Sequence, residues 1–312
     1  MTSTDQGSSA RTDGDSWDIV SSVGYTALGV SAQRAVESER PDALIDDPFA
    51  KHFVLAAGEP HLIGTITKRD APQASPFEYL RGMGLRSRFF DEFFLEAAAS
   101  GIRQAVILAA GLDARAHRLP WPAGVTVFEL DLPEVLAFKD RVYAEQGAAP
   151  TCDRRVVAVD LRDDWPTALK EAGFDPGQPT AWSAEGLLPY LPAAAQELLF
   201  ERVAELSAPG SRAAIEGPTG ALGMTQFAKV EQKYRSEKDT FGKIDITELF
   251  YDDEKTPPVV WFSERGWNTQ GLDMFALADS YGVQYPEVPE DIRELASAMH
   301  YLTCTLAERT TR

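Results

Sequence analysis

Three acidic residues stand where three consecutive apolar runs end. Asp131 follows VTVFEL, Asp160 follows RVVAV, and Glu185 follows TAWSA. If these runs are parallel strands, their carboxyl ends meet at one edge, where open sheets of this kind bind their ligands. A carboxylate at the second strand's end accepts hydrogen bonds from both hydroxyls of a ribose, and one at the third strand's end can lie near an adenine amino group. The pattern therefore predicts a site for an adenosine-bearing ligand.

Two of these acids fit a second interpretation, as the first residues of helices. In the segments DLPE and DLRD, Asp131 and Asp160 would each cap a helix, with a further acid three residues later. Each of the two, taken alone, fits either interpretation. Because all three acids follow strands and a glycine turn belongs to the same predicted edge, ligand binding is favoured.

The glycine turn lies in the stretch QAVILAAGLDARAHRL, residues 104–119. Its apolar run is short and can be buried on both faces, which is typical of a central parallel strand. Gly111 allows a sharp turn, and a helix can begin within residues 114–119. A strand, a turn and a helix form the first half of a nucleotide-binding unit.

The composition of this turn distinguishes between cofactors. A dinucleotide requires several glycines around its pyrophosphate and a helix amino terminus without competing negative charge. The turn AAGLDAR has one glycine and carries Asp113, and the GxGxxG pattern is absent. An acid at this place would repel a diphosphate but favour the ammonium and sulfonium groups of S-adenosyl-L-methionine (SAM). The turn therefore favours a SAM-dependent methyltransferase over a nicotinamide-dependent oxidoreductase, with Asp113 as an ordinary helix cap remaining the alternative.

Strand and helix patterns alternate around this unit. The expected strands are residues 125–130, 155–159, 180–184 and 212–216, followed by strands near 267–272 and 300–306. The expected helices are 133–146, 165–172, 193–206, a segment with Trp261 and Phe262, and 274–281. This alternation predicts an α/β fold with a doubly wound parallel sheet, right-handed crossovers and helices on both faces.

Helical patterns precede the sheet. One covers residues 16–36, and a second covers 44–57, where Asp46 or Asp47 can cap a helix with Pro48 in its first turn. A longer amphipathic pattern covers residues 78–99. Its expected buried face consists of Leu85, Phe89, Phe90, Phe93, Phe94 and Ala97.

These patterns divide the chain into regions. The first residues contain no large apolar side chain, and the charge-rich segment after the fifth strand interrupts the alternation. We expect a disordered tail at residues 1–15, an N-terminal helical layer at 16–100, a methyltransferase core at 101–216 and 259–312, and a lid or substrate-cap insertion at 217–258.

Composition narrows the classes of partner and compartment. The 312 residues carry a formal net charge of −18, which argues against a nucleic acid or an anionic membrane surface as partner. Two cysteines, Cys152 and Cys304, cannot build a disulfide framework, and no metal-ligand spacing occurs. There is neither a secretory signal pattern nor an apolar run long enough to span a bilayer. These features predict a cytoplasmic protein without a metal site.

Several motifs together carry a family resemblance. They are LIDDPFAKHFV (44–54), YLRGMGLRSRFFDEF (79–93), LAAGLDARAHRL (108–119), FELDLPEV (128–135), VAVDLRDDW (157–165) and AEGLLPYLP (184–192). By these motifs the chain resembles the bacterial SAM-dependent methyltransferases related to leucine carboxyl methyltransferases. The resemblance implies a class I methyltransferase fold, Rossmann-like, with a seven-stranded and mainly parallel sheet whose last strand is antiparallel, and with extra helices that form a lid.

The resemblance also assigns roles at the nucleoside end of the cofactor. It implies that Asp131, with the neighbouring Leu132, binds the ribose. It implies that Asp160, together with the backbone at Leu161, contacts the adenine.

At the methionine end, the resemblance places the Gly111 turn beneath the methionine portion and Glu185 close to it. Arg81 matches the arginine that clamps the SAM carboxylate, a bidentate contact that lysine would not reproduce. Taken alone, Arg81 would be a solvated helix residue. The eukaryotic carboxyl methyltransferases have a GxG turn, whereas this chain has Ala109 at the first glycine. SAM binding is therefore implied more firmly than their protein substrate.

The expected chemistry is an in-line displacement at the sulfonium methyl group. A carboxylate acceptor is already ionised at neutral pH, whereas a hydroxyl acceptor requires a base. No base is obvious, because His117 and Tyr190 fit packing roles, and this favours an acidic acceptor. Aromatic residues of the insertion fit either an apolar substrate pocket or the lid's own core: Phe227, Tyr234, Phe241, Phe250 and Tyr251.

The sequence therefore predicts SAM-dependent O-methylation of a carboxylate or hydroxyl, on a small molecule or a carboxyl-bearing substrate. The alternatives are a SAM-binding protein without turnover and a nicotinamide-dependent oxidoreductase.

Overall fold

The computed structural model describes residues 22–67, 80–218, 229–230, 233–234, 249–251, 253–285 and 287–307. The tail predicted at residues 1–15 lies outside these residues, as does most of the insertion predicted at 217–258. No helix within the described ranges is long and apolar enough to cross a membrane.

The described residues form one seven-stranded sheet with the strand order β3-β2-β1-β4-β5-β7-β6. Neighbours among β1 to β5 pair in parallel, whereas β7 runs antiparallel to both β5 and β6. This arrangement confirms the predicted doubly wound sheet with an antiparallel last strand. The strands are β1 Gln104–Leu108, β2 Thr126–Asp131, β3 Asp153–Ala158, β4 Thr180–Ala184, β5 Arg212–Pro218, β6 Trp267–Asp273 and β7 Met299–Leu306.

The central strands are buried on both faces. All five residues of β1 and all five of β4 are buried, as expected for continuous apolar runs inside a parallel sheet. The edge strand β3 fully buries only Val157. Each strand predicted from the sequence overlaps an observed strand. For β1 and β4, burial on two faces leaves a clear run of small and branched residues.

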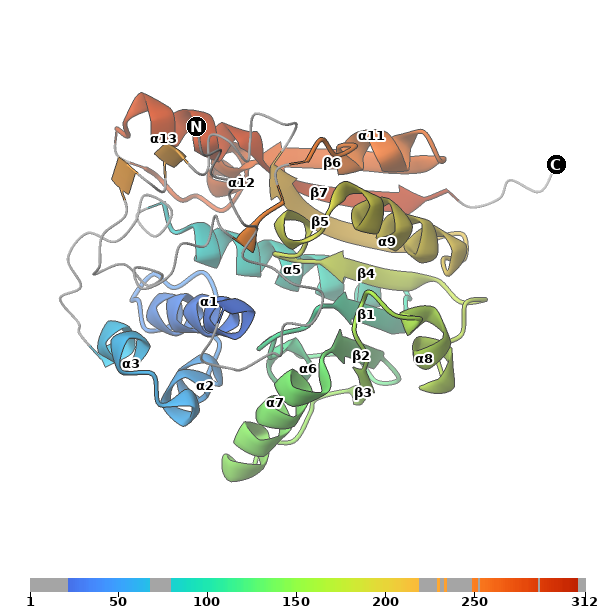
Figure 1. Cartoon of the computed structure of the whole chain (residues 1–312), viewed down its shortest axis with the longest axis horizontal. Helices are drawn as coiled ribbons and strands as arrows, with labels where there is room; N and C mark the ends of the chain where they lie inside the picture. The colour runs from blue at the N-terminus through green and yellow to red at the C-terminus, as the bar shows by residue number, and fades with distance from the viewer. Residues whose placement is uncertain are drawn as a thin grey trace, which may run out of the picture.

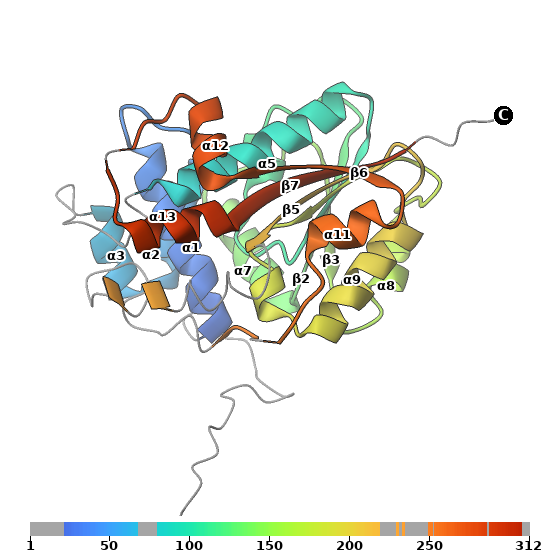
Figure 2. The ribbon, with the colours of Figure 1, turned by 90° about the horizontal axis from the view of Figure 1, so that it is seen from above.

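Helices cover both faces of the sheet (Figure 2). On one face lie α5 (Gly82–Ala99) and α12 (Met274–Ser280), and on the other lie α8 (Trp165–Glu171), α9 (Ala193–Glu205) and α11 (Pro258–Ser263). The face predicted for residues 78–99 is the one that α5 buries. Helix α13 (Glu290–Ala298) adds Ile292 and Leu295 to the same apolar cluster as α5.

The first helices stand at the end of the sheet toward which the parallel strands run (Figure 1). They are α1 (Ser22–Ser38), α2 (Ala50–Ala57) and α3 (Pro60–Thr67). Asp47 Oδ1 accepts hydrogen bonds from the backbone N–H groups of Phe49 and Ala50, both at 3.1 Å. Of the two acids that the sequence offers as caps for this helix, Asp47 therefore makes the bonds at its start.

The sequence patterns do not predict α3 and α13. Helix α3 reads PHLIGTIT, in which Gly64 and the β-branched residues have low helix propensity. Both helices are short, and short helices owe their stability to packing against the rest of the protein rather than to propensity.

His117 lies on the short helix α6 (Arg115–Arg118) and packs against α7 (Pro133–Glu145). Its ring stacks on Tyr143 with centroids 3.5 Å apart, and Phe49 meets it edge-on at 5.8 Å. Burial, helped by the nearby charge of Arg154, lowers the pKa of His117 to about 4. At neutral pH His117 is therefore an uncharged packing residue.

This packing makes stability depend on pH. In the unfolded chain an imidazole has a pKa of about 6.5, so below that pH the unfolded state takes up a proton that folded His117 does not. Between pH 7 and pH 5, the free energy of unfolding should fall by about 1–2 kcal/mol more in the wild type than in His117→Gln. Urea unfolding at the two pH values measures this difference, and equal losses in the two proteins would contradict it.

Candidate functional site

The strand order reverses between β1 and β4, and their carboxyl ends open at one edge of the sheet. Ligands of doubly wound sheets bind at this place. Three of the residues predicted from the sequence stand here: Ala109 directly after β1, Asp131 at the end of β2, and Glu185 directly after β4. The structure thus brings residues from distant parts of the chain to one edge.

The turn after β1 has a strained backbone. Ala109 and Gly111 have φ angles of +51° and +48°. The left-handed region is open to glycine but costs alanine about 1–2 kcal/mol. The turn is held by a hydrogen bond from the N–H of Ala110 to the carbonyl of Leu130, at 2.9 Å. Helix α1 lies beside this turn: a Cβ atom added to Gly111 would be 3.9 Å from the Cβ atom of Ala27.

Asp131 braces this turn instead of capping a helix. Its Oδ2 accepts the N–H of Gly111 at 2.6 Å, and its Oδ1 accepts the N–H of Leu132 at 2.7 Å. Helix α7 has Leu132 at its N-cap, so the helix-cap interpretation of Asp131 is wrong. Burial raises the pKa of the Asp131 carboxyl, and the two backbone hydrogen bonds act against that rise.

Asp160 lies in a turn two residues beyond the end of β3. Its Oδ1 accepts the N–H of Arg162 at 2.8 Å, and its Oδ2 pairs with the Arg162 guanidinium at 2.6 Å. Helix α8 begins farther along, capped by Asp164, so the helix start suggested for Asp160 is also wrong. The N–H of Val159 donates to the carbonyl of Asp131 at 2.9 Å, which places the 160–161 turn beside the end of β2.

Glu185 is held between two buried arginines. Its Oε1 accepts from Nε of Arg86 at 2.9 Å, and its Oε2 accepts from Nη1 of Arg115 at 2.6 Å. Arg86 passes close to Gly186, where an added Cβ would stand 2.4 Å from a guanidinium nitrogen. The glycine after Glu185 thus makes room for this ion pair.

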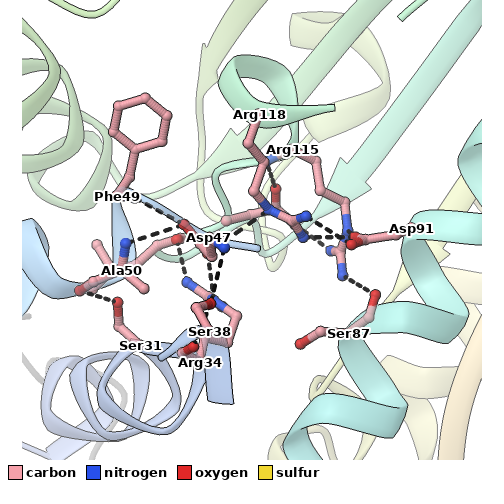
Figure 3. A network of polar contacts seen from close by, with 12 residues as sticks. Ser31, Arg34, Ser38, Asp47, Phe49, Ala50, Ser87, Asp91, Arg115 and Arg118 are labelled. Carbon is pink, nitrogen blue, oxygen red and sulfur yellow. Dashed lines mark hydrogen bonds and ion pairs between the residues drawn. The ribbon is translucent and has the colours of Figure 1, made fainter. Parts of the chain in front are cut away.

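A chain of ion pairs continues from Arg115 to the first helices (Figure 3). Asp91 accepts from Arg115 at 2.7 Å and from Arg118 at 2.6 Å. Arg118 lies 3.8 Å from Asp47, and Asp47 pairs with Arg34 at 2.9 Å. These contacts attach α1 and the segment before α2 to α5 and α6.

Arg34 also contacts the turn after β1 directly. Its Nη2 donates to the carbonyl of Leu112 at 2.6 Å, one residue after Gly111. The first helices and the turn are therefore joined by a direct bond as well as through the ion pairs.

Asp113 belongs to the same set of charges. Its carboxylate pairs with the Arg115 side chain and accepts the Arg115 N–H at 2.6 Å, while the N-cap of α6 is Ala114. Burial is the largest single effect and would raise the pKa of Asp113, but the charges of Arg115, Lys139 and Arg118 and the hydrogen bond from the Arg115 N–H together outweigh it, so the pKa is lowered. The negative charge that the sequence placed in the turn is therefore matched by an arginine two residues later.

Arg81 stands at the start of α5 with a φ of +55°. Its guanidinium pairs with Glu37 at the end of α1 and with the carboxylate of Asp42 at 2.8 Å. Glu37 can approach because residue 84 is glycine, where an added Cβ would lie 2.7 Å from the Glu37 carboxyl carbon. In this structure Arg81 thus binds the segment after α1.

Sequence reasoning missed the residues that surround Glu185. These residues lie within motifs or a strand identified from the sequence: Arg86, Asp91, Arg115 and Glu216. They were not recognised as site residues because charged residues on helices are usually solvated. Their partners on other elements are 24 to 130 positions away along the chain, so local spacing contains no signal for these pairs. The one available signal was the density of arginines in RGMGLRSR and LDARAHR.

Comparison with known proteins identifies the family of the chain and agrees with its fold. The sequence model of the leucine carboxyl methyltransferase family matches residues 27–204. A Mycobacteroides abscessus protein, whose name assigns it to the SAM-dependent methyltransferases, is 90% identical over 98% of this chain and 99% of its own length. A Rhodococcus jostii protein with the same assignment is 55% identical over 94% of this chain and 99% of its own.

Among solved structures, a DUF574 family protein from Streptomyces avermitilis superposes with a TM-score of 0.50 at 15% identity. The superposition covers 88% of this chain and 96% of that one. At this level of identity the likeness concerns the fold.

The ion-pair chain predicts a large effect at Asp91. Replacing Asp91 by Asn leaves the two buried guanidiniums of Arg115 and Arg118 short of a counter-charge, so the free energy of unfolding should fall by about 3 kcal/mol. The matched control is Glu145→Gln, which removes an exposed pair with Arg141 and should change it by less than about 0.5 kcal/mol. Urea unfolding measures the free energy of unfolding of both variants, and losses of similar size in the two would contradict the prediction.

Proposed function

Since this chain belongs to the leucine carboxyl methyltransferase family and is a SAM-dependent methyltransferase, we propose that it methylates an oxygen atom. The acceptor is a carboxylate or a hydroxyl on a small molecule or another carboxyl-bearing substrate. SAM supplies the chemistry, a methyl group activated by the positive charge on sulfur.

The nucleoside half of the cofactor binds at the ends of β2 and β3. Asp131 accepts hydrogen bonds from the ribose hydroxyls. The hydrogen bonds that its carboxylate accepts from the N–H groups of Gly111 and Leu132 fix its position and support this role. Asp160 and the backbone of Leu161 contact the adenine from the adjacent turn. Both carboxylates are hydrogen-bond acceptors at the carboxyl ends of the strands, where an adenosine group requires acceptors.

The methionine half lies over the turn that contains Ala109 and Gly111 and extends toward Glu185. Arg81 binds its carboxylate. The guanidinium has five N–H donors, and its partner Asp42 has a side chain that is 61% exposed. A ligand carboxylate therefore replaces Asp42 on Arg81 without opening the core.

The balance of charge at this edge carries the proposal. Within the described part of the chain, the connected ion pairs join four arginines to five carboxylates, so one negative charge is in excess when all are ionised: Arg34, Arg86, Arg115 and Arg118 with Asp47, Asp91, Asp113, Glu185 and Glu216. SAM has two positive groups and one carboxylate, a net charge of +1. A site with surplus negative charge suits this cation and disfavours a diphosphate.

The protein's part in the transfer is chiefly positioning. Well-oriented reactions gain roughly 7–11 kcal/mol from holding the reacting atoms in line. The braced turn and the fixed Glu185 hold the donor end, and an acceptor oxygen then needs to enter along the line of the bond that breaks. A carboxylate oxygen, with a pKa near 4, attacks without a base, whereas a hydroxyl oxygen must lose its proton.

Asp131→Ala tests the ribose contact. The variant loses the acceptor for the two hydroxyls and should bind SAM at least about tenfold more weakly, a loss of about 1.4 kcal/mol. Calorimetric titration measures the dissociation constant. The control is Asp140→Ala on α7, whose carboxylate pairs with Arg154 away from this edge. An unchanged affinity in Asp131→Ala would refute the ribose assignment.

Transfer itself is tested with methyl-labelled SAM and a panel of small carboxylic acids and phenols. We expect label in extractable products, with methyl esters releasing methanol in base and ethers remaining intact. Asp131→Ala serves as the low-activity control. Label found only on nitrogen, sulfur or carbon would rule out O-methylation.

A further inference from the structure

Near the end of β5 stands an acid to which no direct contact with the cofactor is assigned. Glu216 is 6% exposed, and its Oε1 lies 3.0 Å from Nη1 of Arg86. Its second oxygen, Oε2, is buried and has no hydrogen-bond partner among the described residues. Ionisable oxygens in such surroundings are uncommon in folded proteins, and a catalytic role is one explanation for them.

A second buried group without a partner stands opposite it. The antiparallel register of β5 and β7 pairs Glu216 directly with Tyr301. Tyr301 is 1% exposed, and within the described part of the chain its hydroxyl has no hydrogen-bond partner either. Directly opposed residues of an antiparallel pair present their side chains on the same face about 5 Å apart. The two buried polar side chains therefore lie on the same face of the sheet.

This pair lies at the end of the proposed cofactor site that is farthest from Asp131. β5 is the neighbour of β4 on the side away from β1 and β2. Arg86 lies between Glu185 and Glu216 and pairs with both, at 2.9 and 3.0 Å. Glu216 thus lies one strand beyond the residue proposed for the methionine end, opposite to Asp131.

We propose that Glu216 is the general base of the methyl transfer and that the acceptor is a hydroxyl group, phenol included, whose oxygen also contacts the Tyr301 hydroxyl. This inference rests on the proposed O-methylation and narrows it to hydroxyl acceptors. The acceptor's proton passes to Oε2 of Glu216 as its oxygen lone pair bonds to the methyl carbon. The bond from carbon to sulfur breaks, and its electron pair remains on sulfur as a neutral thioether.

The charges around Glu216 agree with this role. Burial raises the pKa of Glu216 to about 7. Arg86 from α5 acts against the rise and Glu185 after β4 adds to it, while the backbone N–H of Gly186 and then Arg115 from α6 lower it again. Tyr301 from β7 faces the same carboxyl, and its own pKa is raised chiefly by burial. A base whose pKa lies near the working pH combines the ionised form with good proton affinity.

Glu216→Gln tests the proposal, because it keeps the shape of the side chain and removes its basicity. Assays with labelled SAM compare simple phenols with benzoic acids of the same ring substitution. We expect the wild type to methylate phenols, with kcat/KM falling about tenfold per pH unit below pH 7. Glu216→Gln should lose about 10²–10⁴ in kcat on phenols and lose that pH dependence, a loss larger than the weakening of SAM binding that removal of one negative charge from the ion-pair network brings.

Tyr301→Phe provides the companion variant. It should raise KM for phenols several-fold and keep the fall in rate below pH 7, because Glu216 is intact. A purely structural role for the pair would instead weaken SAM binding and activity together and leave the pH profile of each variant unchanged.

Carboxyl titration by carbon-13 NMR, with spectra of Glu216→Gln subtracted, tests the base independently of any acceptor. A resonance that titrates near pH 7 supports the proposal, and one that titrates below pH 5 overturns it even if no compound of the panel is methylated. Methylation of benzoic acids alone, with an unchanged pH profile in Glu216→Gln, also overturns it. That last result would leave the broader O-methylation intact.

Discussion

The buried guanidinium of Arg115 is the interaction on which this edge depends. It is paired with Asp91 on α5, with Asp113 in the turn, and with Glu185 after β4. A buried charge without partners costs several kcal/mol, so folding must bring all three carboxylates to one point. These carboxylates come from three separate elements. Their ion pairs with one guanidinium therefore fix how α5, the turn after β1 and β4 lie relative to one another.

The same charges prepare the edge for its ligand. In the proposed site carboxylates outnumber arginines when all are ionised, which suits the net positive charge of SAM. Family membership decides for SAM over the dinucleotide that the fold alone would also allow. Asp131 keeps acceptor capacity beside the turn, since each of its oxygens accepts a single backbone hydrogen bond. In the proposed site, binding and folding therefore draw on one set of ion pairs, which runs from Arg34 on α1 to Glu216 on β5.

Much of the fold could be predicted from the sequence, because burial on two faces leaves visible apolar runs such as those of β1 and β4. The position of Asp131 at the end of a strand could also be predicted from the sequence. Its hydrogen bond with Gly111 could not be predicted, since a carboxylate beside a helix start fits helix capping equally well. Long-range ion pairs such as Arg115 with Glu185 leave no periodic trace, and the acid of β5 appeared only as part of a strand.

Ala109 has a methyl group in a backbone conformation that suits glycine. The methyl restricts the turn to fewer alternative shapes than glycine would allow, so less conformational entropy remains to be lost when a ligand settles on it. The strain lowers the stability of the fold in exchange for this preorganisation. Residue 109 is therefore a position where thermal robustness and ligand affinity are in competition, and where relatives with glycine and with alanine can differ in both properties at once.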